Sequence, residues 1–299
     1  MDVHVRELRY FVAVAEELHF TRAAERLFVS QPALSKQIRA LEEQLRADLF
    51  VRDRRNVSLT PAGEALLPAA RELIAAWDAA QKVVADAAAT AAAVLRIGFS
   101  TSVGRGVIPR IQQQFARVRP GWRLQLRQVD WDDPTGGLAG GITDLAIVWL
   151  PVPTEERFSQ LVLVEEPRHV ALRAEHSLAG RREIEFAELL NEPFLALPED
   201  AGSPRDYWLA VEHRDGRAPR IGGIVTNAEE TFEAVLAGLG VALLSAGNAE
   251  IYQRPGVATV PVRGISPSRL VLIWRGDDHR EAVRDFVRAA ERAMQPASE

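Results

Sequence analysis

The stretch of residues 30–45, SQPALSKQIRALEEQL, constrains the fold more than any other part of the chain, because its apolar residues recur at steps of four, three and four. Such spacing places them on one face of a helix, and that face must be buried. These residues are Leu34, Ile38, Leu41 and Leu45. Ser30 is suited to cap the first turn, and Pro32 falls within that turn, where its missing amide proton does little harm. The opposite face is polar, which is typical of a solvated helix or of a surface that recognises a partner.

Two shorter helical segments precede this stretch. The first is expected to end near His19, and its apolar positions are Leu8, Phe11, Ala15 and Leu18. The second has the sequence TRAAERLF, and Thr21 is expected to cap it. Four of its residues are expected to pack inward: Ala23, Ala24, Leu27 and Phe28. Three short helices with a brief turn between the second and the third are typical of a helix-turn-helix, in which the last helix enters the major groove of DNA.

Residues 46–60 predict a basic hairpin. Two short apolar runs, residues 49–51 and 57–59, predict a pair of strands. The tip between them carries three cations beside a single aspartate, and these cations are Arg52, Arg54 and Arg55. A tip of this kind is either a solvated turn or a wing that contacts phosphate or the minor groove.

A long helix is predicted to follow the hairpin, with Thr60 as its cap and Pro61 in its first turn. Its apolar residues repeat every seven positions in two interleaved sets. Such repetition predicts a coiled-coil seam between two copies of the chain, and the alternative is a stripe that packs within one copy. The predicted seam consists of Leu66, Ala70, Leu73, Trp77, Ala80 and Val84. Pro68 lies inside the helix and is expected to bend it or to loosen its first turns.

The alanine-rich stretch of residues 86–93 marks a domain boundary, because short apolar strands alternate with helices beyond it. Strands are expected at VLRIGFS, WRLQLRQV, LAIVWL, LVLVEE, HVALR, PFLALP, GVALLS and RLVLIW. Helices are expected at IPRIQQQFARV, EFAELL, TFEAVLAGL and HREAVRDFVRAAERAM, and a glycine-rich helix is expected before LAIVWL. This alternation predicts βα units with parallel strands. Two α/β lobes joined by crossing strands would enclose a cleft, the usual place for a small ligand.

The predicted fold class is therefore α+β and multidomain. The expected domains are a winged helix-turn-helix DNA-binding domain at residues 1–60, a linker and dimerisation helix at 61–90, and a two-lobed α/β domain at 91–299. The first lobe is expected to comprise residues 91–162 and 268–299, and the second lobe residues 163–267.

Seven residues are expected to line the cleft, because six of them follow strands at the edge of a sheet where ligands collect and Thr226 comes just before a helix. They are Ser100, Thr101, Ser102, Trp131, Trp149, Pro198 and Thr226. The small hydroxyl groups could bind a carboxylate or a polar oxygen of a ligand, or could only cap a helix, and the tryptophans could form a stacking wall or belong to the core. Asp130, Asp132 and Asp133 would repel an anion if they pointed inward.

Composition and motifs exclude several classes of protein. The 299 residues contain no cysteine, which removes disulfides, thiolate nucleophiles and cysteine-ligated metals. The chain has no export signal and no membrane-spanning run, so a cytoplasmic location and no membrane partner are expected. Neither a metal-ligand spacing nor a nucleotide-binding fingerprint occurs, so no metal and no cofactor are expected. GFSTS approaches a nucleophile elbow but ends in serine and lacks a histidine in triad order, so no enzyme is expected.

Residues 8–67 resemble the DNA-binding part of the LysR-type transcriptional regulators in the order and spacing of their residues. The pieces GFSTS, GITDLAIV and GLGVALL are similar to parts of that family's effector-binding domain, which resembles the type 2 periplasmic binding proteins. Arg46 stands where the family commonly has glycine, and Ser245 stands where it commonly has proline. The resemblance implies a homotetramer built as a pair of dimers, with double-stranded promoter DNA, a small-molecule effector and RNA polymerase as partners.

The resemblance also implies that the polar face of residues 30–45 is a recognition surface. The expected DNA contacts are Thr21, Arg22, Gln31, Pro32, Ala33, Ser35, Lys36, Arg39, Arg52, Arg54 and Arg55. Gln31 suits adenine or phosphate, while Lys36 and Arg39 have the reach for guanine edges or phosphate oxygens. Residues 1–60 hold ten Arg and Lys against nine Asp and Glu, a net charge of +1, so affinity must come from clustered side chains and from a second half-site.

The predicted function is sequence-specific transcription regulation, in which a small-molecule effector held between two lobes controls DNA binding. The alternative is a solute-binding protein of the same two-lobe architecture without a gene-regulatory role, and an enzyme is a third hypothesis. Retardation of the chain's own upstream DNA at low salt would favour the regulator, and turnover of a candidate ligand would favour the enzyme.

Overall fold

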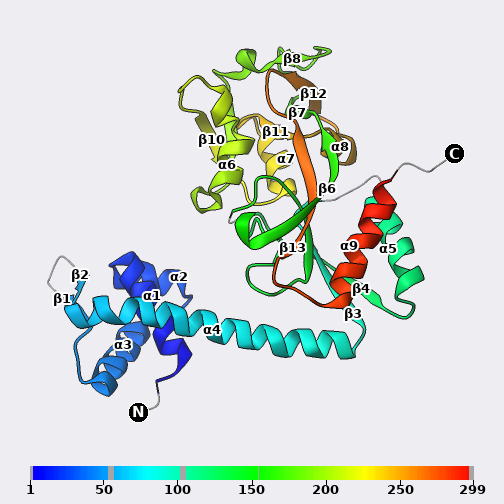
Figure 1. Ribbon diagram of the computed structural model, residues 1–299. Helices are drawn as coiled ribbons and strands as arrows, with labels where there is room; N and C mark the ends of the chain where they lie inside the picture. Colours follow the sequence, from blue (N-terminus) through cyan, green and yellow to red (C-terminus); the bar gives the residue numbers. More distant parts are fainter. Residues whose placement is uncertain (1–2, 53–56, 102–105, 154, 296–299) are drawn as a thin grey trace. The chain divides into compact units, whose positions relative to one another are not determined.

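The computed structural model describes residues 3–52, 57–101, 106–153 and 155–295. The chain divides into two compact units, Met1–Ala88 and Ala89–Glu299, whose helices and strands are drawn in Figure 1. Each unit has its own buried hydrophobic residues. None of the helices in the described ranges has an apolar stretch that would reach across a lipid bilayer.

The N-terminal unit contains three short helices, a two-stranded hairpin and most of one long helix. In chain order these elements are α1 (Val5–Glu17), α2 (Phe20–Arg26), α3 (Gln31–Leu45), β1 (Phe50–Arg52), β2 (Val57–Leu59) and α4 (Pro61–Ala91). The apolar faces of α1, α2 and α3 meet in one core, where Phe11, Leu34 and Ile38 are fully buried. β1 and β2 pair antiparallel, with Phe50 opposite Leu59. These elements confirm the predicted helix-turn-helix, hairpin and long helix.

Both ends of α2 differ from the sequence prediction. His19, not Thr21, is the N-cap, and its Nδ1 accepts a hydrogen bond from the backbone N–H of Arg22 over 3.4 Å. Imidazole is not among the usual capping groups, which are the side-chain oxygens of Ser, Thr, Asp and Asn. The prediction that Phe28 packs inward is wrong, because this residue closes the turn after α2 in the left-handed region (φ +53°) and is 95% exposed.

The ends of α3 are fixed by side chains on both sides. Ser30 Oγ accepts a hydrogen bond from the backbone of the first turn, as predicted. Glu42 is buried near the C-terminal end, and its Oε1 accepts hydrogen bonds from the backbone N–H groups of Leu49 (3.0 Å) and Phe50 (3.3 Å). Arg46 follows the helix in the left-handed region (φ +52°), where glycine is favoured. Glu42 therefore ties α3 to the hairpin, a link that the sequence analysis missed.

The C-terminal unit contains a five-stranded sheet in the order β4-β3-β5-β13-β6. Its strands are β3 (Val94–Phe99), β4 (Arg123–Gln128), β5 (Leu145–Trp149), β6 (Phe158–Glu166) and β13 (Ser268–Arg275). β3 runs parallel to β4 and β5, whereas β13 runs antiparallel to β5 and β6, so the sheet is mixed rather than built only from the predicted parallel strands.

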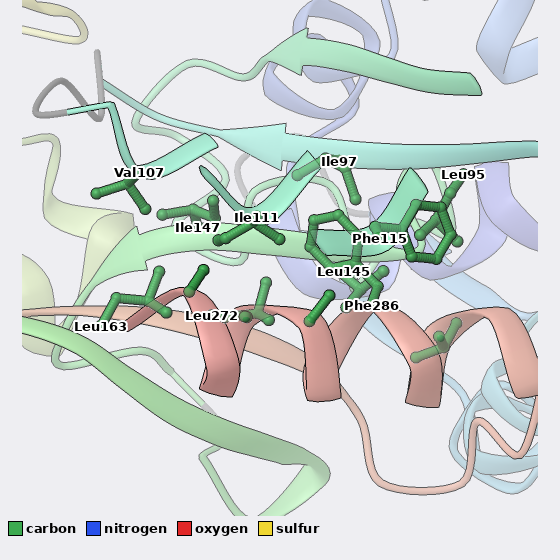
Figure 2. Packing of buried hydrophobic residues seen from close by; sticks show 14 of the residues in the cluster. Leu95, Ile97, Val107, Ile111, Phe115, Leu145, Ile147, Leu163, Leu272 and Phe286 are labelled. Carbon is green, nitrogen blue, oxygen red and sulfur yellow. The ribbon is translucent and has the colours of Figure 1, made fainter. Parts of the chain in front are cut away.

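Two helices bury their apolar faces against this sheet, and they are α5 (Val107–Val118) and α9 (Glu281–Met294). Figure 2 shows Phe115 of α5 and Phe286 of α9 in this core together with Ile97 and Leu145 from the strands. The rings of Phe115 and Phe286 meet edge to face with centroids 5.4 Å apart. The predicted helices IPRIQQQFARV and HREAVRDFVRAAERAM are thus confirmed.

A second sheet of the C-terminal unit has the order β11-β7-β12-β8, and β9 and β10 form a separate parallel pair. The strands are β7 (Arg168–Arg173), β8 (Ile184–Glu185), β9 (Pro193–Ala196), β10 (Arg220–Ile224), β11 (Ala242–Ser245) and β12 (Val257–Arg263). The helices are α6 (Ser203–Trp208), α7 (Ala228–Leu236) and α8 (Ala246–Ile251), with 3-10 turns η1 (Glu155–Arg157), η2 (Phe186–Leu189), η3 (Glu199–Ala201) and η4 (Val211–His213).

This half of the C-terminal unit differs more from the sequence prediction than the first half. The sequence analysis missed β8, β10, β12, α6 and α8, and EFAELL forms the 3-10 turn η2 rather than an α-helix. β7 pairs antiparallel with both β11 and β12. The chain leaves the first sheet between β6 and β7 and returns between β12 and β13, so the predicted lobe boundary at residues 162–163 lies inside β6.

The glycine-rich helix predicted before β5 does not form. Gly136, Gly137 and Gly141 have φ values of +61°, +89° and +67°, which no α-helix accommodates. Asp133 organises a loop instead, because its carboxylate accepts hydrogen bonds from the backbone N–H groups of Thr135 (2.9 Å) and Gly137 (3.0 Å). Closely spaced glycines disfavour a helix and permit these turns.

A buried charge cluster joins β3, the start of β5 and the start of α9. Asp144 is fully buried and accepts hydrogen bonds from Arg96 Nη2 (2.7 Å) and Arg280 Nη2 (2.8 Å). Burial by itself would raise the pKa of Asp144, but the hydrogen bonds from Arg96 and the attraction of Arg280 outweigh it and hold this pKa below its usual value. The cluster therefore fixes the two strands whose carboxyl ends lead into the site described below.

Candidate DNA-binding surface and ligand cavity

The polar side of α3 forms an accessible surface, which we call the α3 face. It consists of Gln31, Pro32, Ala33, Ser35, Lys36 and Arg39, of which all but the half-buried Ser35 are exposed. Gln31 Nε2 donates a hydrogen bond to Ser35 Oγ over 2.9 Å, one helical turn further on. Because the apolar side of the same helix is buried in the core, the structure brings these six predicted residues together on one surface.

The cations around the α3 face differ in whether they already have a partner. Within the described ranges, no residue forms an ion pair or a hydrogen bond with the side chain of Lys36 or Arg39. Arg22, at the start of α2, instead donates a hydrogen bond from Nη2 to the backbone O of Glu17 (2.6 Å) and lies 3.4 Å from the carboxylate of that residue. Arg22 must exchange this partner before it can bind phosphate, whereas Lys36 and Arg39 need not.

The structure gives less information on the other residues predicted to contact DNA. Thr21 is exposed in the first turn of α2, although it is not the cap. Arg52 is the last residue of β1. Arg54 and Arg55 lie outside the described residues.

One side of α4 is docked on the N-terminal unit. Gly63, Leu66, Leu67, Ala70 and Ile74 pack against the core of this unit or lie within it. Ala70 is fully buried there, so its predicted place in a seam between copies is wrong, and Leu66 is half-buried against the same core. Arg71 Nη2 lies 2.8 Å from a carboxylate oxygen of Glu16, and Arg9 pairs with Asp78, so ion pairs to α1 flank the docked side.

The rest of the predicted seam is accessible, and we call it the α4 stripe. It consists of Leu73, Trp77, Ala80 and Val84, at steps of four, three and four. Leu73, Trp77 and Val84 are 56%, 51% and 70% exposed. Large apolar side chains in a continuous exposed stripe are typical of an interface with a partner. The first positions of the heptad repeat are therefore buried in or against the core of the N-terminal unit, whereas the later positions are exposed.

The C-terminal unit contains a cavity of about 100 Å³ that is partly open to solvent. Four predicted residues line it, and they are Ser100, Thr101, Trp131 and Trp149. Ser102 lies outside the described residues. Pro198 and Thr226 do not line the cavity, and these two predictions are corrected to Leu197 and Val225, their neighbours on the N-terminal side.

The position of Thr226 is explained by its role as part of a helix cap. Its Oγ1 donates a hydrogen bond to a carboxylate oxygen of Glu230 (2.8 Å), and its backbone O accepts one from the N–H of Trp131 (3.0 Å). Hydrogen bonds from the backbone and side chain of Thr226 lower the pKa of Glu230. Pro198 is half-buried at the start of η3. Both residues thus shape loops around the cavity without contributing to its wall.

Aromatic rings make up much of the cavity wall. They belong to Trp131, Trp149, Trp208, Phe232 and Tyr252. Trp149 and Trp208 meet edge to face with centroids 6.4 Å apart, and the rings of Phe232 and Tyr252 lie 5.5 Å apart. The sequence analysis missed Trp208, Phe232 and Tyr252, because nothing in the local pattern of α6, α7 or α8 distinguishes a cavity position from a core position.

Thr101, Trp149 and Asn248 form a small hydrogen-bonded group in the cavity wall. Thr101 Oγ1 accepts hydrogen bonds from Trp149 Nε1 (3.1 Å) and Asn248 Nδ2 (3.4 Å). Trp131 Nε1 donates to the backbone O of Ser100 over 3.2 Å. Asn248, also missed, lies in the first turn of α8. Ser245 caps this helix by accepting a hydrogen bond from the Asn248 backbone N–H (3.2 Å), so its hydroxyl has a function at a position where the family commonly has proline.

The described lining residues carry no charged side chain. Asp130 and Asp132 are exposed, and Asp133 is occupied by its own loop, so none of the three acidic residues near Trp131 points into the cavity. Across the described ranges, no group of three or more His, Asp and Glu residues could hold a metal ion. The described part of the lining is therefore uncharged and rich in aromatic rings.

Comparisons with known proteins cover both units. Residues 5–64 match the family described as bacterial regulatory helix-turn-helix protein, lysR family, and residues 88–295 match the LysR substrate binding domain. The Hca operon transcriptional activator HcaR of Escherichia coli is 34% identical over 287 residues, which cover 95% of this chain and 96% of HcaR. The regulator ShiR of Corynebacterium glutamicum is 34% identical over 263 residues, covering 87% of this chain and 88% of ShiR.

Solved structures agree with these matches. Full-length CbnR in complex with its target DNA has a TM-score of 0.53 and 25% identity, covering 98% of this chain and all of that one. Full-length OxyR from Pseudomonas aeruginosa has a TM-score of 0.52 and 26% identity with the same coverage. The chain belongs to the LysR family of bacterial transcriptional regulators, with an N-terminal helix-turn-helix and a C-terminal effector-binding domain.

Proposed function

We propose that the chain is a one-component regulator that reads a promoter sequence with the α3 face, pairs with a second copy through the α4 stripe and responds to a small molecule in the cavity. The observation that carries this proposal is the state of the α3 face, where Lys36 and Arg39 are exposed beside Gln31 and have no partner in the described part of the chain. These two exposed cations are available to phosphate oxygens without breaking an existing contact among the described residues, as a DNA-binding surface requires.

The α3 face is proposed to make two kinds of contact, one that recognises bases and one that binds the phosphate backbone. Gln31 and Ser35 present amide and hydroxyl groups that match base edges in the major groove, and Gln31 suits adenine. Lys36 and Arg39 lie further along the helix and supply charge for phosphate oxygens or guanine edges. Thr21 and Arg22 on α2 and the arginines of the hairpin, Arg52, Arg54 and Arg55, add backbone contacts around this centre.

Pairing through the α4 stripe follows from the small charge of each DNA-binding unit. One copy engages few phosphates, and a second copy makes binding of the second half-site an intramolecular event. The stripe offers Leu73, Trp77, Ala80 and Val84 for this contact. The full assembly is proposed to be a homotetramer, a pair of such dimers.

The cavity is proposed as the site of regulation. A ligand can shift the protein between two states only by binding one of them more tightly. The cavity wall includes residues from β5 of the first sheet and from β11 of the second, so a ligand there contacts elements of both halves of the unit. The regulator is proposed to act in the cytoplasm on promoter DNA and RNA polymerase, without a cofactor, metal or membrane and without catalysis.

DNA retardation with the full-length protein tests this proposal. At low salt, the chain is expected to retard the DNA upstream of its own gene and to retard a shuffled sequence of the same composition at least tenfold more weakly. A solute-binding protein with the same cavity would retard neither DNA. Equal retardation of both sequences would contradict sequence-specific regulation.

Sedimentation analysis tests the pairing. Trp77→Glu places a charge in the α4 stripe and is expected to convert the assembly to smaller species. Ala79→Glu is the matched control, because Ala79 is also exposed but lies roughly 200° around the helix from Trp77. If both variants sediment as the unmodified protein does, the stripe is not the interface.

A further inference from the structure

The turn between α2 and α3 carries the most exposed large apolar side chain within the described ranges. Phe28 is 95% exposed, whereas the next residues in this order, Val84 and Val83, are 70% and 69% exposed. A single apolar residue on a protein surface is common and needs no partner by itself. The backbone of Phe28 provides a second, independent observation.

The conformation of Phe28 is fixed by the way α2 ends. The N–H of Phe28 donates a hydrogen bond to the backbone O of Glu25 (3.1 Å), and the N–H of Val29 donates one to the backbone O of Ala24 (3.0 Å). These two bonds form a Schellman motif, in which the residue at the position of Phe28 is left-handed and is usually glycine. Phe28 has φ +53°, which is unfavourable for a residue with a bulky side chain.

Two other non-glycine residues in the described part of the N-terminal unit have a left-handed backbone, and both differ from Phe28. Leu18 (φ +46°) is 47% exposed, so the fold covers about half of this residue. Arg46 (φ +52°) is exposed, but water solvates its guanidinium group. Phe28 combines the unfavourable backbone with an apolar ring that the fold does not bury. Strained residues of this kind are concentrated at functional sites.

The place of Phe28 in the helix-turn-helix identifies its partner as DNA. Phe28 comes three residues before Gln31, the first residue of α3, so their Cα atoms are at most about 11 Å apart. The first residues of the last helix contact base edges in the major groove, which is about 12 Å wide. Phe28 therefore lies at the wall of the groove when Gln31 reaches a base edge, and a protein partner would have to share this margin with the duplex.

We propose that the ring of Phe28 packs against the apolar groups of the groove wall, which are the deoxyribose rings and the methyl groups of thymine. The ring thereby strengthens DNA binding by the α3 face without adding charge. This inference rests on the proposed function, because it takes the α3 face as the DNA-binding surface. Since burial of an apolar ring releases no counterions, this contribution to affinity is independent of salt.

Fluorescence anisotropy of the full-length protein with its upstream DNA over a salt series tests the contact. Phe28→Ala is expected to weaken binding about tenfold at every salt concentration and to leave the slope of log affinity against log salt unchanged. Lys36→Gln, which removes a charge, is expected to reduce that slope by about one. Val162→Ala, at an apolar position of β6 that is 45% exposed, is the control and should change affinity less than about twofold.

Two further variants separate loss of the ring from damage to the turn. Asparagine tolerates the left-handed conformation, so Phe28→Asn is expected to unfold at the same temperature as the unmodified protein or a few degrees higher. Its DNA affinity should nevertheless fall about tenfold, as in Phe28→Ala. Phe28→Leu keeps most of the apolar surface and should weaken binding less than about threefold.

DNA in which deoxyuridine replaces thymidine identifies the group that the ring contacts. If the ring packs on thymine methyl groups, the unmodified protein and Phe28→Ala bind this DNA with similar affinity. If the ring packs on deoxyribose, the difference of about tenfold between the two proteins persists.

Several results would overturn the inference. Binding by Phe28→Ala within about twofold of the unmodified protein would exclude the contact and leave the ring to a protein partner. A slope that falls by about one in Phe28→Ala, or a loss in Phe28→Leu as large as that in Phe28→Asn, would exclude an apolar contact. An equal loss in Val162→Ala would exclude a specific role of Phe28. In each case the unmodified protein still retards its upstream DNA, so these results are distinguishable from failure of the proposed function.

Discussion

The α3 face and the cavity present their polar groups in opposite states. Lys36 and Arg39 on the α3 face are exposed and unpaired within the described ranges, whereas Thr101 and Asn248 in the cavity are 8% and 7% exposed and bond to each other. An exposed cation is solvated by water and needs no partner within the protein. A buried polar group, in contrast, is normally hydrogen-bonded within the folded protein. The first surface therefore suits a highly charged polymer, and its binding should depend on ionic strength.

The largest expected effect is a loss of stability in the C-terminal unit, which contains the cavity, while the α3 face in the N-terminal unit is unaffected. Asp144→Asn leaves Arg96 and Arg280 without their buried carboxylate, and we expect the C-terminal unit to lose about 3–5 kcal/mol of unfolding free energy. Five of the six tryptophans lie in this unit, so fluorescence during urea unfolding reports on it. Asp132→Asn, at an exposed position, is the control and should change stability by less than about 0.5 kcal/mol.

The same cluster predicts acid sensitivity of the C-terminal unit. The folded pKa of Asp144 lies below its ordinary value of 3.8, so its ionised form stabilises the fold at pH above 3.8. This contribution is lost as the pH falls from 3.8 through the folded pKa. We expect the difference in stability between the unmodified protein and Asp144→Asn to shrink over that range in unfolding experiments at stepwise lower pH. A difference that stays constant would show that ionisation of Asp144 is not its cause.

We expect the loss of Glu42, which ties α3 to the hairpin, to cost less stability than the loss of Asp144 in the C-terminal unit. Glu42→Ala removes the acceptor of the Leu49 and Phe50 N–H groups, and we expect the N-terminal unit to lose about 2 kcal/mol. Hydrogen exchange measured at these two amides should accelerate accordingly. Glu43→Ala, an exposed neighbour on the same helix, should leave both rates unchanged. Similar acceleration in both variants would point to a general loss of helix rather than to this link.

The two sites also differ in how far the sequence predicts them. The α3 face lies on one helix, so its spacing, its cap at Ser30 and its apolar side fix which residues share a surface. The cavity is assembled from β5, β7, β9, β11, α6, α7, α8 and several loops, and alternation along a strand shows which side is buried but not what it faces. Trp149 ends a predicted strand and was identifiable, whereas Trp208 and Asn248 depend on helices with no local signal.

The errors have the same physical origin. Ala70 and Val84 fit one heptad pattern, yet only contacts with α1, α2 and α3 decide that the first is buried and the second exposed. From the sequence alone, Glu42 looks like a solvent-facing residue of an amphipathic helix. In the structure it accepts hydrogen bonds from two backbone amides of the hairpin region. The sequence predicts the pattern within an element, and the tertiary fold decides what that pattern contacts.

Two substitutions on the α3 face separate base recognition from phosphate binding. Gln31→Ala is expected to reduce the preference for upstream DNA over a shuffled sequence about tenfold, because one base-edge contact is lost. Lys36→Gln is expected to weaken binding to both sequences alike and to reduce the slope of log affinity against log salt by about one. Fluorescence anisotropy over a salt series measures both quantities. The opposite assignment, with Lys36 changing the preference and Gln31 the slope, would reverse the roles given to these residues.

The smallest expected effect touches neither the α3 face nor the cavity. Arg46 has φ +52°, a conformation that costs a side chain with Cβ more than it costs glycine, so Arg46→Gly is expected to stabilise the N-terminal unit by about 0.5–1 kcal/mol. Arg46→Ala keeps the backbone strain and should give no such gain, which separates strain from loss of the guanidinium group. Thermal unfolding of the two variants measures this difference. If alanine stabilises as much as glycine, the charge of Arg46 and not its backbone conformation limits stability at the end of α3.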